Sequence, residues 1–262
     1  MWQLTGHLTA DLAACLRDLV GDERFSGVER AAVLGLLRDV EALVRLRDAG
    51  SPVVRWAACV QLRELTRADR AACVRVLHAI AVDEVNAPAL RWRVARELLE
   101  FGSGGRELAV PALLAMVEDA ALPSRARASA AREVADARPD LRGRMVRFLQ
   151  SLRADPDPSV RLHVLRKVGP YEPRQAAIAL RELASDRAVR PGLRLRAALA
   201  AHELRRDFRE AAAVVARDIA RDEAVAVHIR VKAARALAQR SDLCRAEAQE
   251  LFVELMARLT RR

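Results

Sequence analysis

The apolar residues of this chain follow a helical period around an Arg that recurs six times. The six segments are VVRWAACVQL, LRWRVARELL, ARASAAREV, VRLHVLRKV, LRLRAALA and IRVKAARAL. In every copy, apolar residues stand one position before the Arg, three after it and seven after it. These offsets lie on one face of an α-helix, so the pattern predicts six amphipathic helices, which we call the Arg helices. Their arginines, spaced by 36, 36, 34, 33 and 36 residues, are Arg55, Arg91, Arg127, Arg161, Arg194 and Arg230.

A second column of residues keeps the same register. An Asp precedes each repeat Arg by 7, 8, 8, 6, 8 and 8 residues, and the six are Asp48, Asp83, Asp119, Asp155, Asp186 and Asp222. Before the last five of them, apolar residues stand at offsets of three, six and ten. This stripe predicts a second amphipathic helix that ends at the Asp of each repeat, and we call these the Asp helices. One hairpin cannot bury both stripes, so neighbouring hairpins must stack.

Prolines and glycines mark the expected helix ends. Proline is tolerated in the first turn of a helix, and five prolines lie three or four residues before a repeat Arg: Pro52, Pro88, Pro123, Pro158 and Pro191. Ser51 and Asp157 precede two of them, as N-caps do. The segment FGSGG at 101–105 predicts a turn. Pro111 falls inside a predicted Asp helix, which is either kinked there or begins later.

These motifs carry a family resemblance. The segment DPDPSVRLHVLRKVG, preceded by a helix that ends at Asp155, resembles the HEAT repeat, and RAACVRVLHAIAVDE and REAAAVVARDIARDE are similar to HEAT-like arrays of bacterial proteins. The resemblance covers roughly residues 48 to 240. It implies an all-α fold, a right-handed α-solenoid of about seven hairpins, in which the repeat Asp and Arg residues form a structural ladder. We expect one domain over 1–262, with an N-terminal capping hairpin at 1–48, regular repeats at 49–240 and a C-terminal capping helix at 241–262.

The charge has two interpretations. The chain has 45 basic and 35 acidic residues, a net charge of +10, and its only lysines are Lys167 and Lys232. An excess of Arg can reflect a GC-rich coding sequence, with the arginines spread over solvated helix faces. It can also serve an anionic partner.

No motif in the sequence predicts catalysis, a cofactor or a metal site. Cys15, Cys59, Cys73 and Cys244 are too widely separated to predict a zinc site, and buried free thiols fit a reducing cytoplasm. HELRR at 202–206 begins like a zinc-protease helix but has Arg206 where the second His must stand. No signal peptide or membrane span is evident, so we expect a soluble cytoplasmic protein.

The best candidate binding surface is a row of basic residues on the Asp helices, which the HEAT resemblance places on the concave side. At offsets of −13, −8 and −5 from the closing Asp they can project away from the packed stripe. This basic ribbon consists of Arg70, Arg75, His78, Arg106, Arg142, Arg147, Arg181, Arg209 and Arg217. We therefore expect a non-enzymatic scaffold that engages a macromolecule, an acidic protein first, through this concave face.

The alternative is a nucleic-acid-binding protein, because the resemblance also extends to HEAT-like alkylpurine DNA glycosylases. Trp56 and Trp92 both follow a repeat Arg by one residue and offer a stacking surface for a base. An apolar column at that position is explained more simply by packing. A glycosylase also needs a carboxylate beside exposed aromatic rings, and only Glu97 and Glu100 lie near in sequence.

Overall fold

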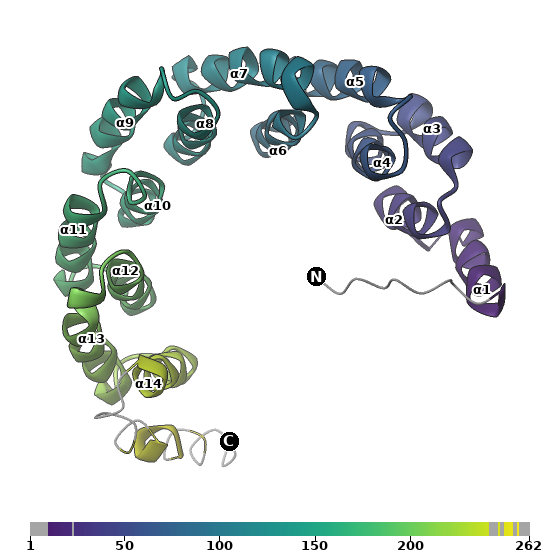
Figure 1. Cartoon of the computed structure of the whole chain (residues 1–262). Coiled ribbons are helices and arrows are strands. Elements are labelled where there is room, and N and C mark those ends of the chain that lie inside the picture. Colours follow the sequence, from purple (N-terminus) through teal and green to yellow (C-terminus); the bar gives the residue numbers. More distant parts are fainter. Residues whose placement is uncertain (1–9, 23, 241–245, 247–248, 254–255, 257–262) are drawn as a thin grey trace. The chain divides into compact units, whose positions relative to one another are not determined.

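The computed structural model describes residues 10–22, 24–240, 246, 249–253 and 256 (Figure 1). Throughout these residues the secondary structure is helical, without a β-strand, which confirms the predicted all-α class. The α-helices are α1 Ala10–Gly21, α2 Gly27–Leu37, α3 Val40–Ala49, α4 Pro52–Leu65, α5 Arg70–Val82, α6 Pro88–Leu99, α7 Gly102–Glu118, α8 Ser124–Ala137, α9 Arg142–Ser151, α10 Pro158–Val168, α11 Pro173–Ser185, α12 Pro191–Leu204, α13 Arg209–Arg221 and α14 Val227–Arg240. Two short 3-10 helices are η1 Leu152–Ala154 and η2 Arg206–Phe208.

The helices pack in chain order, as in a helical repeat. From α1 to α8 and from α9 to α14, each helix packs against the next. Several helices also pack against the next helix but one, as α5 does with α7 and α11 with α13. The chain forms two compact units, unit 1 at Met1–Arg138 and unit 2 at Pro139–Arg262. The single domain over 1–262 stays a prediction.

Each unit has two rows of helices (Figure 1). In unit 1 the Asp helices α3, α5 and α7 form the outer row of a bend, and α2 with the Arg helices α4, α6 and α8 forms the inner row. Unit 2 has the Asp helices α9, α11 and α13 in its outer row and the Arg helices α10, α12 and α14 in its inner row. The predicted concave position of the Asp helices is therefore not what the structure shows.

The predicted apolar columns form the core. Three residues after the repeat Arg, every side chain has 0% exposure, and these are Ala58, Val94, Ala130, Val164, Ala197 and Ala233. Six residues before the closing Asp, exposure is at most 1%, for Leu77, Leu113, Leu149, Leu180 and Ala216. Both helix types therefore bury the stripe that the periodicity predicts.

The helix starts follow the proline pattern. Pro52, Pro88, Pro158 and Pro191 open α4, α6, α10 and α12, as predicted, and Pro123 is the N-cap residue of α8. The side chain of Asp157 accepts from the N–H of Ser159 and caps α10, whereas Ser51 holds the N-cap position of α4 without a side-chain hydrogen bond.

The glycine segment differs from its prediction. Instead of a turn over 101–105, α7 begins at Gly102, which has a φ of 83°, and Gly104 and Gly105 lie in its first turn. A Cβ on Gly105 would stand 2.2 Å from the carbonyl oxygen of Leu98. The absence of a side chain there lets α7 start directly against the end of α6. Pro111 lies inside α7, so the helix does not begin later.

The two predicted caps have different outcomes. The described part of the predicted hairpin at 1–48 contains the three helices α1, α2 and α3, and α2 opens with a capping box between Ser26 and Glu29. The predicted capping helix at 241–262 lies outside the described residues except for 246, 249–253 and 256. Among the helices that the structure describes, none has the length and apolar character needed to cross a membrane.

Candidate functional site: the Arg column, the basic ribbon and an open cleft

Four repeat arginines bind the end of the preceding Asp helix. The Nε–H groups of Arg91, Arg127, Arg194 and Arg230 donate to the carbonyl oxygens of Ala81, Val117, Ala184 and Ala220, at 3.2, 2.9, 2.9 and 3.0 Å. The last carbonyls of a helix have no partner within the helix. We call these contacts the Arg–carbonyl bonds, since each ties an Arg helix to the Asp helix before it.

The repeat aspartates shape the turn that follows. One carboxylate oxygen of Asp83, Asp186 and Asp222 accepts from the backbone N–H two residues further on, at 2.9 to 3.0 Å, and Asp119 and Asp155 do the same. At the four turns with an Arg–carbonyl bond, the predicted ladder residues thus lie at the same helix end, and in the described contacts the backbone connects the Asp and Arg columns.

The first repeat has a different arrangement. Asp48 lies inside α3 and pairs with Arg47, whose Nε stands 2.7 Å from the carboxylate, and the Nε–H of Arg55 donates to the carbonyl of Arg47. Arg47 is buried and also pairs with Asp69 at 3.0 Å. The hydrogen bond with Asp48 holds the pKa of Arg47 above its usual range.

The Arg–carbonyl bond is missing at Arg161. Here α9 ends early, at Ser151, and the 3-10 turn η1 follows. The residue two positions before Asp155, which supplies the accepting carbonyl in four other repeats, is therefore Arg153 and lies in η1. The Asp-to-Arg separation of six residues, against eight in the neighbouring repeats, is the sequence signal for this change. No carbonyl partner is recorded for Arg161, and its half-buried side chain faces a cleft instead.

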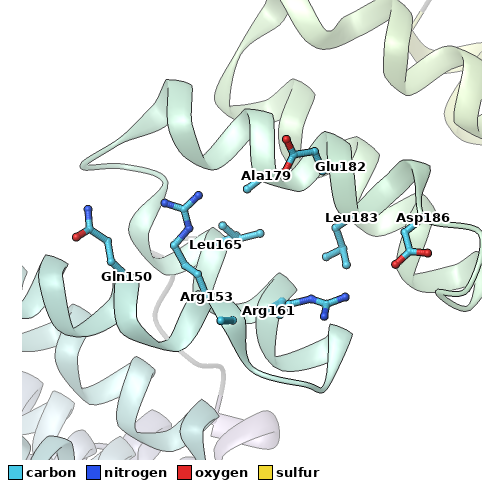
Figure 2. A pocket seen from close by; sticks show the side chains of 9 residues that line it. Gln150, Arg153, Arg161, Leu165, Ala179, Glu182, Leu183 and Asp186 are labelled. Carbon is cyan, nitrogen blue, oxygen red and sulfur yellow. The ribbon is translucent and has the colours of Figure 1, made fainter.

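This inter-repeat cleft lies in unit 2 and has a volume of about 610 Å³. Figure 2 shows the side chains of Arg153 and Arg161 in the space below α11, with Leu165 and Leu183 beside them. The residues that line it are Gln150, Arg153, Ala154, Arg161, Leu165, Ala179, Glu182, Leu183 and Asp186. The sequence predicts Arg161 and Asp186 only as ladder residues, and it does not predict Gln150 and Arg153 as site residues.

The basic ribbon lies at the surface in both units. In unit 1, Arg70, Arg75 and Arg106 are exposed and His78 is half-buried. In unit 2, Arg142, Arg147, Arg181 and Arg209 are exposed and Arg217 is half-buried. All lie on Asp helices, so they belong to the outer rows rather than to a concave face.

Two ribbon arginines stack on aromatic rings of the next repeat. The guanidinium of Arg142 lies 5.9 Å from the ring centroid of Tyr171, and that of Arg181 lies 5.7 Å from the centroid of Phe208. Each ring stands just before the following Asp helix. The face of an aromatic ring attracts a cation electrostatically, and the guanidinium group keeps its charge. These contacts therefore fix the direction of the two side chains.

The two carboxylates considered for a glycosylase differ: Glu100 is exposed at the C-cap of α6, whereas Glu97 is half-buried. Glu97 on α6 forms an ion pair with Arg63 on α4, and burial raises its pKa while Arg63 opposes that shift. Trp92 is half-buried with the guanidinium of Arg96 5.9 Å from its ring centroid. The ring and the half-buried carboxylate are thus both engaged by arginines, which favours the packing interpretation of the Trp column.

Cys59 and Cys73 are buried free thiols with 0% exposure, whereas Cys15 is exposed and Cys244 lies outside the described residues. Hydrogen bonding with Cys73, followed by burial, raises the pKa of the Cys59 thiol. In a variant with Ser at positions 15 and 244, iodoacetamide is therefore expected to leave both thiols unlabelled in the native protein and to label both in urea. Mass spectrometry of the intact protein measures this, and fast native labelling would show that the thiols are accessible.

Within the described ranges, no group of three or more His, Cys, Asp or Glu side chains could hold a metal ion. Comparison of the chain with family models, with curated proteins and with solved structures finds no match in any of the three. The HEAT-like resemblance therefore rests on the repeat residues themselves.

Proposed function

We propose that the chain is a right-handed HEAT-like solenoid that acts as a non-enzymatic scaffold in the cytoplasm. It holds an acidic protein partner on the basic ribbon. Because the Asp helices form the outer rows, this proposal places the partner along the outer row of a unit and not in a concave groove.

The observation that carries the proposal is the arrangement of Arg142, Arg147 and Arg181 on neighbouring Asp helices of unit 2. All three are exposed, and Arg142 and Arg181 are positioned by the rings of Tyr171 and Phe208. Side chains fixed before binding lose less conformational entropy when they bind. Guanidinium groups also match carboxylates in geometry, so this row suits acidic side chains.

The same row carries acidic side chains, which favours a protein over a nucleic acid. Exposed carboxylates interrupt the ribbon at Glu107, Glu182, Glu210 and Asp218. A nucleic acid presents a continuous line of phosphates and would be repelled by them. A protein partner can place its carboxylates opposite the arginines alone.

Charge reversal tests the ribbon. The double variant Arg147→Glu/Arg181→Glu is expected to bind a fluorescein-labelled Glu-rich peptide about 100-fold more weakly than the wild type, because two attractions become repulsions. Arg166→Glu/Arg196→Glu is the matched control, since these exposed arginines lie on the Arg helices α10 and α12 and change the net charge equally. Fluorescence anisotropy at low salt measures both.

Two results would contradict the proposal. Equal losses in the two double variants would mean that net charge alone attracts the peptide. Absence of peptide binding, together with binding of random duplex DNA that weakens steeply with salt, would favour the nucleic-acid alternative.

A further inference from the structure

Another hollow of unit 2, which we call the alanine pocket, is lined by α12 and by α11 and α13, neighbours in the outer row (Figure 1). Ala198 and Ala201 of α12 line it with 3% and 2% exposure, whereas Val214 of α13, also in its lining, is 44% exposed. The pocket therefore opens on the outer row and reaches the buried surface of α12. Its volume is about 190 Å³.

The pocket lies where one repeat has a small residue in a column of large ones. Ala201 stands seven residues after the repeat Arg of α12. At this offset the other five copies have a larger side chain with 0% exposure: Leu62, Leu98, Val134, Val168 and Leu237. Protein interiors are close-packed, so a hollow that reaches such a position marks a core side chain that this repeat lacks. A side chain from a partner can fill it.

The outer surface of the same two helices is apolar where other Asp helices are basic. Eight residues before the closing Asp, the ribbon has Arg75 on α5 and Arg147 on α9. At that offset α11 and α13 have Ile178 and Val214, which are 36% and 44% exposed. A partner that covers this part of the outer row therefore removes apolar surface from water, which is favourable.

Size and charge define the side chain that fits the pocket. Small-molecule sites occupy about 300–1,000 Å³, so this pocket is too small for them, but an apolar cavity of about 150 Å³ holds one benzene molecule. Arg181 is the charged residue of the lining, and its guanidinium lies 5.7 Å from the ring centroid of Phe208, which also lines the pocket. A carboxylate beside the inserted side chain therefore meets a cation whose direction is already fixed.

We propose that the alanine pocket receives one large apolar side chain, a Leu or a Phe, of the acidic partner, next to a carboxylate that pairs with Arg181. This inference rests on the proposed function, because Arg181 belongs to the basic ribbon, and it adds an apolar anchor to the charges. Apolar anchors in pockets contribute a large share of the affinity of protein interfaces. An acidic partner suits the pocket better than a second copy of this chain, whose net charge of +10 would be repelled.

Two peptides of equal charge test the anchor. Fluorescein-labelled Glu-Asp-Glu-Leu-Glu-Asp-Glu is expected to bind the wild type about 10-fold more tightly than the same peptide with Ala in place of Leu, as fluorescence anisotropy measures. Ala211→Leu fills the pocket from a half-buried position on α13, and Ala201→Leu fills it with the residue that α4, α6 and α14 have at that offset. Each variant is expected to bind the two peptides within about 2-fold of each other.

Ala72→Leu is the matched control. Ala72 on α5 and Ala211 on α13 both stand eleven residues before the closing Asp and are both half-buried, but Ala72 lies in unit 1, away from the pocket. This variant should keep the preference for the Leu peptide. Thermal melting confirms that each variant is folded, and the comparison of the two peptides on the wild type needs no variant.

Three outcomes overturn the anchor: equal binding of the two peptides by the wild type, a preference that survives in both folded pocket variants, or its loss in Ala72→Leu as well. Dimerisation of the wild type in sedimentation velocity that Ala201→Leu abolishes would instead assign the pocket to a second copy. Equal binding contradicts the anchor alone, whereas absence of binding by both peptides contradicts the proposed function and the anchor with it.

Discussion

Gly105→Ala is expected to destabilise the protein by about 2–3 kcal/mol, the largest single-methyl effect we foresee. The new Cβ would stand 2.2 Å from the carbonyl oxygen of Leu98 and 2.8 Å from the Cβ of Phe101. Neither atom belongs to the end of a flexible side chain, so the relief of this contact requires α6 and α7 to move apart. Urea unfolding followed by far-UV circular dichroism measures the loss.

The neighbouring glycine is the matched control. Gly104 lies in the same helical turn, is exposed, and has no atom within 4 Å of the position that a Cβ would take. Gly104→Ala is expected to stabilise the protein by about 0.5–1 kcal/mol, because Ala loses less backbone entropy in a helix. Shifts of the same sign in the two variants would show that the close start of α7 against α6 is not a constraint.

The core could be predicted because two helical stripes repeat in one register. Ala58, Val94 and Ala130 stand at the same offset from a repeat Arg, and each is fully buried in the structure. A stripe seen once can be an accident of composition, but the stacking of hairpins requires each copy to bury the same face. The periodicity therefore identifies the core column by column.

The row that lies inside the bend was predicted wrongly. Both helix types are amphipathic, so periodicity alone does not distinguish them. Both also bury large side chains, such as Leu62 and Leu98 on the Arg helices and Leu77 and Leu113 on the Asp helices. The concave position of the Asp helices came from the resemblance to a family and not from the residues themselves. Because the basic ribbon lies on the Asp helices, it belongs to the outer rows and not to a concave face.

The inter-repeat cleft was the part of the candidate site that sequence reasoning missed. A separation of six residues between Asp155 and Arg161 shows that the repeat is irregular but not which group loses its partner. That depends on η1, because the backbone carbonyl two residues before Asp155 belongs to Arg153 in this 3-10 turn and not to the end of an α-helix. Backbone hydrogen bonds are local in a helix, so a helix that ends a few residues early changes the partners available to the next helix.

The second large effect is expected at Arg230. Its side chain is 6% exposed, and its Nε–H donates to the carbonyl of Ala220 at 3.0 Å. Gln at this position is too short to reach that carbonyl, so Arg230→Gln should leave a buried acceptor without a partner and lower the free energy of unfolding by about 1–3 kcal/mol. For a chain of this size each kcal/mol lowers the melting temperature by about 2–4 °C, which differential scanning calorimetry resolves.

Arg161→Gln is the matched substitution in the same column and the same unit, and its expected effect is within about 0.5 kcal/mol. Both arginines occupy the repeat Arg position, but Arg230 is buried and forms the Arg–carbonyl bond, whereas Arg161 is half-buried and does not. Similar losses at the two positions would mean that the repeat arginines stabilise the array by packing of their aliphatic parts. A loss confined to Arg230 would instead show that the early end of α9 releases Arg161 from a structural role.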